Sequence, residues 1–306
     1  MTRSAAEAVN RTLTHWADDD LAAVWIDRLS SDQLMARAAT VDARVAAGDD
    51  LPLAGTTLAV KGNIDVAGLR TTAGCPSYGS VAVRSAAAVR ALEAAGAVVV
   101  GTTNLDQFAT GLTGQSSPHG APINPRWPHL LTGGSSSGSA VAVASGQVDF
   151  ALGTDTAGSG RVPAAFQGLV GLKPTRGRIS TAGVVPACQS LDCVSIFAED
   201  LELAALAAEL ASGIDADDPW SRPLPEPATG GAPVRIGVPE PATLDFDGDP
   251  GASARFASAV DALLARAGAQ GVPVDLEPFL AAGRLLYEGA FVAERYAAVG
   301  DFLAAD

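Results

Sequence analysis

The sequence predicts an α/β protein in which helices cover a central β-sheet. Its 306 residues are 48% apolar, which is enough for a large core in one or two domains. Helical segments alternate along the chain with short, wholly apolar segments such as residues 98–100 (VVV). Strands that are apolar at every position are typical of sheets with helices on their faces. These observations together define the fold class.

The first two thirds of the chain carry this alternation. Residues 1–50 are predicted to form two polar, Ala-rich helices, with Asp18–Asp20 and Ser30–Ser31 as caps. Residues 51–214 follow as the core of the fold, in which β-branched residues predict a strand within 56–66. Ser85 is expected to cap the next helix. The remaining elements are a strand at 98–104, a helix at 137–146, a strand at 150–156 and the segment 169–174.

The organisation changes after residue 214. Residues 215–234 are rich in proline and are predicted to form a surface linker. A strand at 234–239, a helix at 252–268 and a last helix from about residue 277 follow. Because the last helix reaches the chain end without a stop signal, we expect residues 235–306 to be the start of an incomplete C-terminal part. Residues 1–306 are then a single, C-terminally truncated domain.

Composition and charge exclude several function classes. A formal net charge of −14 at pH 7 argues against nucleic-acid binding, which needs a basic footprint. The sequence contains no run of 18 apolar residues, so we expect no membrane partner. Cys75, Cys188 and Cys193 are odd in number and form no CxxC pair. They are typical of reduced thiols in a cytoplasmic protein without a metal site.

The two lysines are unusual in this chain. Lys61 and Lys173 are the only lysines among 20 basic residues, and the other 18 are arginines. A lysine in such a chain indicates a position where arginine would fail, because lysine can lose its proton in a protein and arginine cannot. The alternative is that chance or packing has retained them, and for each lysine taken alone this alternative stays open.

Small residues gather between positions 131 and 163, where they allow backbone N–H groups to approach a ligand. A phosphate-binding loop is disfavoured because the GxxxxGK[ST] motif is absent. Residues 134–138 satisfy GxSxG, the nucleophile elbow of α/β-hydrolases, with Ser136 as the nucleophile. That mechanism needs a later histidine, but the last histidine is His129. We therefore expect Ser136 not to be the nucleophile.

A neutral lysine can activate a serine where no histidine is available. At its ordinary pKa near 10.4, only about 0.04% of a lysine is neutral at pH 7. Burial among apolar groups can bring this pKa to around 7, at a cost of roughly 4 kcal/mol. Lys61 follows the segment TLAV and Lys173 follows GL, so position alone does not decide between the two lysines.

The chain resembles the amidase-signature family. The resemblance is carried by Lys61 in AVKGNID, Ser135 in GGSSSGSA and Ser159 in GTDTAGSGRVPA, and it covers roughly residues 50–200. It implies a mixed sheet covered by helices and a catalytic triad formed by the three residues. In the family mechanism Ser159 attacks an amide carbonyl, and Ser135 passes the proton of Ser159 to neutral Lys61.

The same resemblance assigns the backbone around the triad. It places a cis peptide bond at Gly134–Ser135 or at Ser135–Ser136. It also implies an oxyanion hole, in which one donor is typically worth about 3 kcal/mol at the transition state. The flanking Asp155 and Arg161 are interpreted as an ion pair that fixes this loop, and Lys173 as structural. The expected oxyanion donors are the backbone N–H groups of Thr156, Ala157, Gly158 and Ser159.

Within the family, the chain is most similar to the amidase portion of allophanate hydrolases, above all in residues 183–198 (GVVPACQSLDCVSIFA). This implies release of ammonia from the terminal amide of allophanate (urea-1-carboxylate). The substrate is expected to contact Gly111, Tyr287 and Arg295. Tyr287 and Arg295 are eight residues apart on one predicted helix, hence on nearly the same face. Alternatively, Tyr287 is a core aromatic and Arg295 a solvated surface charge.

Three other functions stay open. The first is a broad-specificity amidase. The second is a protein like the glutamine-dependent tRNA amidotransferase subunit that passes ammonia to a partner, and the third is an inactive interaction domain. We expect a cytoplasmic enzyme of urea degradation and nitrogen metabolism, with a small-molecule amide as its partner and a homodimer left open. No cofactor, metal, nucleic acid or membrane is expected.

Overall fold

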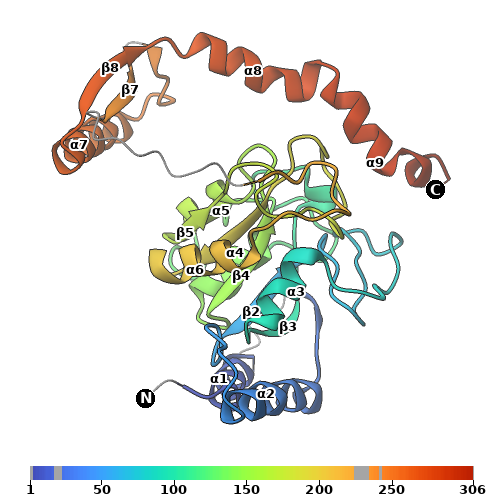
Figure 1. The fold of residues 1–306 in the computed structure, drawn as a ribbon. Helices are drawn as coiled ribbons and strands as arrows, with labels where there is room; N and C mark the ends of the chain where they lie inside the picture. Colours follow the sequence, from blue (N-terminus) through green and yellow to red (C-terminus); the bar gives the residue numbers. More distant parts are fainter. Residues whose placement is uncertain (1–2, 17–22, 224–233, 241–242, 306) are drawn as a thin grey trace. The chain divides into compact units, whose positions relative to one another are not determined.

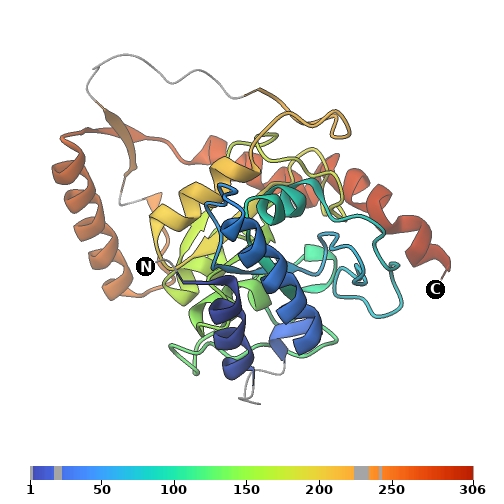
Figure 2. The same cartoon turned by 60° about the horizontal axis from the view of Figure 1, so that its bottom comes forward.

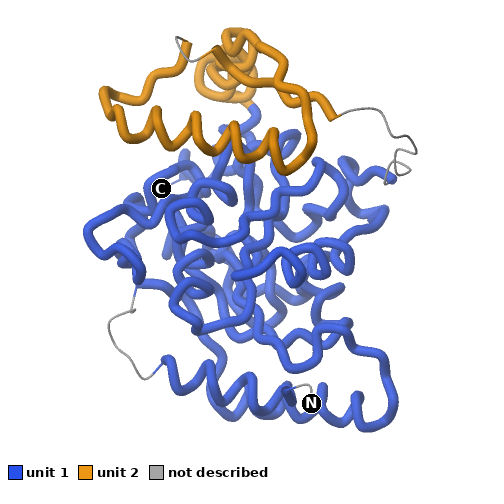
Figure 3. Tube along the Cα trace, turned by 90° about the vertical axis from the view of Figure 1, so that its left-hand side faces the viewer, with its two compact units in different colours: residues 1–224, 294–306 blue, residues 225–293 orange. Residues whose placement is uncertain are grey.

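The computed structural model of the protein describes residues 3–16, 23–223, 234–240 and 243–305 (Figure 1). Residues 1–224 and 294–306 form one compact unit, and residues 225–293 form a second (Figure 3). Half of the expected linker at 215–234 (residues 224–233) lies outside the described residues. The single domain over 1–306 stays a prediction.

A six-stranded sheet forms the centre of the first unit, in the order β1-β3-β2-β4-β6-β5. Strand β2 pairs in parallel with β3 and β4, whereas the other pairs are antiparallel. The sheet is therefore mixed, which confirms the predicted α/β fold class. Its strands are β1 (Trp25–Arg28), β2 (Thr57–Lys61), β3 (Val98–Thr103), β4 (Phe150–Thr154), β5 (Val170–Leu172) and β6 (Val194–Ala198).

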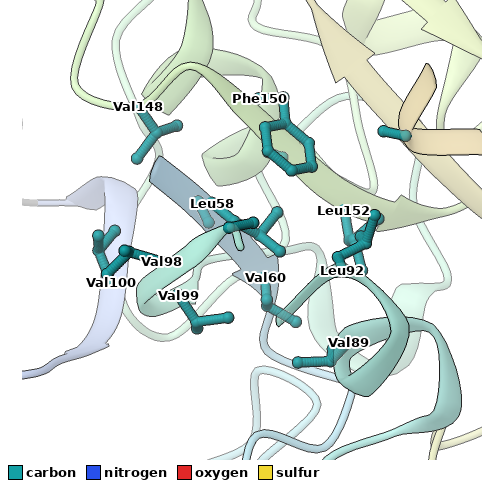
Figure 4. Packing of buried hydrophobic residues seen from close by; sticks show 14 of the residues in the cluster. Leu58, Val60, Val89, Leu92, Val98, Val99, Val100, Val148, Phe150 and Leu152 are labelled. Carbon is teal, nitrogen blue, oxygen red and sulfur yellow. The ribbon is translucent and has the colours of Figure 1, made fainter. Parts of the chain in front are cut away.

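The four inner strands β3, β2, β4 and β6 are buried at every position. Leu58 and Val60 of β2 lie among the apolar side chains of the neighbouring strands, including Phe150 and Leu152 of β4 (Figure 4). Burying one such side chain stabilises the fold by about 1.5–3 kcal/mol. The last residue of β2 is Lys61, and its side chain is as buried as the apolar ones. The core thus encloses an amine.

Helices from the described part of the first 223 residues surround this sheet, and one of them is part of the core. All residues of α4 from Ser137 to Val143 are buried, because its small side chains allow close contact with β2, β3, β4 and β6. The helices are α1 (Ala5–His15), α2 (Ser31–Ala46), α3 (Ala87–Ala94), α4 (Ser137–Ala144), α5 (Arg161–Gln167) and α6 (Leu201–Ala211).

The predicted helix caps have different outcomes. Ser30 caps α2 and accepts the Gln33 N–H, which confirms the prediction. The prediction for Ser85 is wrong, because α3 has no side-chain cap and the Ser85 hydroxyl accepts the N–H of Ala67 instead. Asp18–Asp20 lie outside the described residues.

The second unit contains a parallel pair of strands, β7 (Arg235–Pro239) and β8 (Gln270–Val274), with helices α7 (Pro250–Ala267) and α8 (Glu277–Glu288). The predicted single last helix is wrong. α8 ends at Glu288, and α9 (Phe291–Ala305) begins after a break. Gly289 lies in this break in an extended conformation, and glycine has a low helix propensity. No helix in the described part of the chain is long and apolar enough to cross a bilayer.

Asp149 links α1 and the preceding Arg3 to the start of the central strands. α1 and α2 lie side by side (Figure 2). Asp149, just before β4, accepts hydrogen bonds from Arg3 and Arg11 at 2.7 and 2.5 Å. It also accepts the N–H of Thr57 at the start of β2, at 2.8 Å. Burial favours the neutral carboxyl, but the arginines and this N–H outweigh burial and lower the pKa of Asp149.

We predict that Asp149→Ala lowers the free energy of unfolding by about 2–4 kcal/mol at pH 7, because it leaves charged groups without a partner. Since the folded-state pKa is lowered, this stabilisation is present above the ordinary carboxyl pKa and is lost as the pH falls through the folded pKa. Urea unfolding at pH 7 and pH 3 measures both effects. Asp49→Ala, which breaks an exposed pair with Arg44, is the control and should change little. Equal losses in the two variants would contradict the prediction.

Candidate active site

The amine of Lys61 is the centre of the site. β2 carries it to the end of the sheet, where Nζ lies 2.8 Å from Ser135 Oγ and 2.8 Å from Thr154 Oγ1. Asn63 donates to the same Thr154 hydroxyl at 3.3 Å. The Lys61 side chain is fully buried. Side chains from three segments far apart in sequence thus converge at this amine.

Burial determines the charge of this amine. It lowers the pKa of Lys61 to about 7, although the negative charges of Asp106, Asp155 and Asp192 act in the opposite direction. A large fraction of Lys61 is therefore neutral near pH 7, and its lone pair can accept the proton of the Ser135 hydroxyl. This is the state that a general base requires.

Ser135 is held by its backbone. The Gly134–Ser135 peptide bond is cis, which confirms the predicted cis bond at one of the two expected positions. The Ser135 carbonyl accepts the N–H of Asp106 at 3.1 Å. A Cβ on Gly134 would overlap the Asp106 carboxylate and the backbone of Gly114, so only glycine fits there.

Ser159 lies at the edge of the same site and is 5% exposed. Its N-terminal neighbours follow β4, and its backbone carbonyl accepts the N–H of Ser136 at 3.3 Å. Its hydroxyl is 3.5 Å from the carbonyl oxygen of Gly111. The hydrogen bonds between described residues do not include one from Ser159 Oγ to Ser135 Oγ. The structure therefore brings Ser159 to Gly111, and the relay through Ser135 stays a prediction.

An ion pair holds the loop between β4 and α5. Asp155 is buried and accepts both Nε and Nη2 of Arg161, at 2.9 and 3.0 Å. Burial raises the pKa of Asp155, but the hydrogen bonds from Arg161 and from the Gly158 N–H outweigh it, and the pKa falls below its usual value. This confirms the interpretation of the pair as a loop anchor.

The predicted oxyanion donors differ in whether their N–H groups already have a hydrogen-bond acceptor. The Gly158 N–H already donates to Asp155 Oδ1 at 2.7 Å. The N–H groups of Thr156, Ala157 and Ser159 donate to no other described residue. Three of the four predicted donors thus have no acceptor within the described chain, whereas that of Gly158 is used to shape the loop.

Ser136 and Lys173 have other partners. The Ser136 hydroxyl is buried and donates to the Thr154 carbonyl at 3.2 Å. Lys173 donates to the Pro174 carbonyl at 2.7 Å. Ser136 therefore supports the end of β4, and only Lys61 of the two lysines lies beside Ser135.

Comparisons with known proteins identify the family. The family model described as "Amidase" matches residues 17–305. This chain is a member of the amidase-signature family. As an amidase it belongs to a group of hydrolases that act on C–N bonds.

This amidase is similar to proteins of several names. It is 46% identical over 280 residues to urea amidolyase of Saccharomyces cerevisiae, covering 91% of this chain and 15% of that protein. It is 43% identical over 268 residues to a glutamyl-tRNA(Gln) amidotransferase subunit of Symbiobacterium thermophilum, covering 84% of this chain and 54% of that one. The structure of Kluyveromyces lactis allophanate hydrolase matches with a TM-score of 0.88 and 42% identity, over 99% of this chain and 50% of that chain. The amidase thus spans about half or less of these relatives.

The predicted substrate ligands lie in different elements. Gly111 is beside Ser159, as described above. Tyr287 lies in α8 of the second unit, and Arg295 lies in α9, in the part that belongs to the first unit. Because the helix is interrupted at Gly289, the prediction that Tyr287 and Arg295 share the face of one helix is wrong. Their contact with a substrate stays a prediction.

Sequence reasoning missed four polar residues of the site. Thr154 and Asn63 contact each other and the Lys61 environment, and Asp106 and Asp192 are buried carboxylates near the lysine. For three of these four residues, the sequence contains a feature that weakly indicates a place in the site. Thr154 ends an apolar strand, Asn63 is two residues after Lys61, and Asp192 interrupts an otherwise uncharged stretch.

We predict that Lys61→Arg and Lys61→Met each lower kcat for amide hydrolysis by about a hundredfold to ten-thousandfold, the usual contribution of a general base. Arginine keeps the charge but cannot accept a proton, and methionine keeps the length without the amine. Ammonia release from malonamide is the measurement. Ser136→Ala is the control and should keep most of the activity. Substantial activity in Lys61→Arg would defeat the neutral-lysine mechanism.

The pKa of Lys61 also predicts a pH profile. Because the predicted mechanism uses the neutral amine, we expect kcat/KM for malonamide to rise with pH, pass its midpoint at about 7 and level off above it. Initial rates between pH 5 and pH 9 test this. A profile that is flat across this range would show that the base is another group.

Proposed function

We propose that the chain is an amidohydrolase that releases ammonia from the terminal amide of allophanate, by a Ser159–Ser135–Lys61 mechanism. The observation that carries the proposal is the buried Lys61 amine, whose pKa is lowered to about 7 and which lies 2.8 Å from the Ser135 hydroxyl. A buried amine in this state is suited to proton transfer and is costly to keep for packing alone.

The proposed reaction has two stages. Ser159 Oγ attacks the amide carbonyl while its proton passes to Ser135 and the proton of Ser135 passes to Lys61. The tetrahedral intermediate then collapses, the C–N bond breaks, and the nitrogen takes the proton back through Ser135 and leaves as ammonia. A water molecule then attacks the acyl carbon and gives a proton to Lys61 through Ser135. The bond between the acyl carbon and Ser159 Oγ breaks, Ser159 Oγ takes the proton back along the same path, and the acid product leaves.

The oxyanion of each intermediate needs donors next to Ser159. The N–H groups of Thr156, Ala157 and Ser159 belong to one loop whose ends are held by Asp155 and Arg161. Donors that are oriented before the reaction stabilise a developing charge without reorganisation. The Gly158 N–H supports the same loop by donating to Asp155.

Allophanate carries a carboxylate, so a specific site requires a cation. Arg295 is the proposed ligand of this carboxylate, with Gly111 at the urea part. One observation supports a place for Arg295 near the site. Its neighbour Glu294 accepts the N–H and the hydroxyl of Ser190, the latter at 2.8 Å, so the start of α9 contacts the loop that also carries Asp192.

The experiment that tests the substrate compares ammonia release from allophanate, malonamide and glutamine. We expect the highest kcat/KM with allophanate. A preference for malonamide would favour a broad-specificity amidase. A preference for glutamine would favour the function named for the Symbiobacterium relative.

Arg295→Met tests whether this arginine binds the allophanate carboxylate, because it removes the charge and keeps much of the side-chain length. A charge-assisted hydrogen bond is worth roughly 1.5–3 kcal/mol, so kcat/KM for allophanate should fall by about tenfold to a hundredfold or more. The value for uncharged malonamide should change little. Arg44→Met, at an exposed arginine paired with Asp49, is the control. Equal losses for both substrates would make Arg295 structural.

A further inference from the structure

The antiparallel pairing of β4 and β6 continues beyond both strands and leads to a contact outside the triad. Its last ladder pair is Thr154 with Val194. The Asp155 N–H then donates to the Cys193 carbonyl at 2.8 Å. One step further, the Thr156 hydroxyl donates to Asp192 Oδ1. The strand register therefore places Asp192 opposite the first residue of the predicted oxyanion loop.

The carboxylate of Asp192 is buried and accepts several hydrogen bonds. It is 4% exposed. Besides the Thr156 hydroxyl it accepts the Ala187 N–H at 2.9 Å and the Cys188 N–H at 3.2 Å. Such donors favour the ionised carboxylate, although burial is the larger effect and raises the pKa of Asp192.

The loop that presents Asp192 is itself fixed. The Ser190 carbonyl accepts a hydrogen bond from Arg176, and the Ser190 hydroxyl donates to Glu294 of α9. The Asp192 N–H donates to the Cys188 carbonyl at 2.9 Å. An anchored carboxylate can hold Thr156 in one place, which a mobile one could not do.

We propose that Asp192 is a positioning residue of the amidase reaction, which fixes the oxyanion loop through the Thr156 hydroxyl and contributes negative charge near Lys61. The inference rests on the proposed Ser159 mechanism. It does not depend on which amide is the substrate.

Three carboxylates act on Lys61, and they differ in their partners. Asp155 is paired with Arg161, and Asp106 accepts the N–H groups of Gly114 and Ser116. The hydrogen-bond donors of Asp192 named above are all uncharged. Each of the three carboxylates raises the pKa of Lys61, against the larger effect of burial. Removing the charge of Asp192 therefore lowers the pKa of Lys61, whereas removing the Thr156 hydroxyl leaves that charge in place.

The two roles can be separated by substitution. Asp192→Asn removes the charge and turns one oxygen into an N–H₂ group that meets a backbone or hydroxyl donor. Thr156→Val removes only the hydroxyl, and Thr156→Ser restores it without the methyl group. The measurement is the rate at which a small fluorophosphonate labels Ser159 between pH 5 and pH 9, followed by the mass of the adduct. This reaction uses the nucleophile, its base and the oxyanion hole but needs no specific amide.

We expect Thr156→Val to lower the plateau rate by about tenfold to a hundredfold, the usual cost of misplacing a reacting group or an oxyanion donor. The acid limb of the pH profile, in which the labelling rate rises with pH to its plateau, should keep its wild-type midpoint. Thr156→Ser should recover most of the rate. Asp192→Asn should lower the plateau and also move the acid limb to lower pH. A merely structural role would lower rates without moving the limb.

Asp218→Asn is the matched control. Asp218 is also buried and accepts the hydroxyl and N–H of Thr181, but it is not among the charges that act on Lys61. Its variant should label like the wild type. An unmoved limb in Asp192→Asn, or a Thr156→Ser variant as slow as Thr156→Val, would overturn the proposal. Normal labelling of a protein that does not hydrolyse allophanate would defeat only the proposed substrate.

Discussion

The burial of one amine constrains the whole site. Lys61 ends a strand whose other residues are core side chains, so the sheet carries its amine out of contact with water. A charged amine in such a place is costly, and the protein avoids much of this cost by releasing the proton. The desolvation that would destabilise a charged Lys61 thus lowers its pKa, so that the neutral amine can act as a base. Nearby carboxylates limit this effect and keep the pKa close to neutral pH.

Small residues around the amine allow other groups to reach it. α4 packs against the central strands with Gly, Ser, Ala and Val residues, and Gly134 admits the Asp106 carboxylate where a Cβ would not fit. Buried carboxylates are costly unless they are hydrogen-bonded. Asp106, Asp155 and Asp192 each accept backbone N–H groups from loops of the site. They therefore fix the loops as well as the charge around Lys61.

The fold class could be predicted from the sequence because it depends on local patterns. The predicted strand segments 56–66, 98–104 and 150–156 contain the inner strands β2, β3 and β4, and Ser30 is a helix cap as predicted. Where competing local contacts decided, prediction failed. The Ser85 hydroxyl accepts the Ala67 N–H rather than capping α3, and Gly289 interrupts a helix that was predicted to run unbroken to residue 306.

The sequence by itself determined which residue types could do the chemistry: two lysines in a chain of arginines, serines among small residues, and no histidine after position 129. The family resemblance then singled out Lys61, Ser135 and Ser159. Only the tertiary structure decided the environment of Lys61 and the partners of Asp106 and Asp192. The physical reason is that burial and charge interactions depend on distances between segments remote in the chain. Thr156 and Asp192 meet because the register of β4 and β6 aligns them, and no local pattern in the sequence encodes that register.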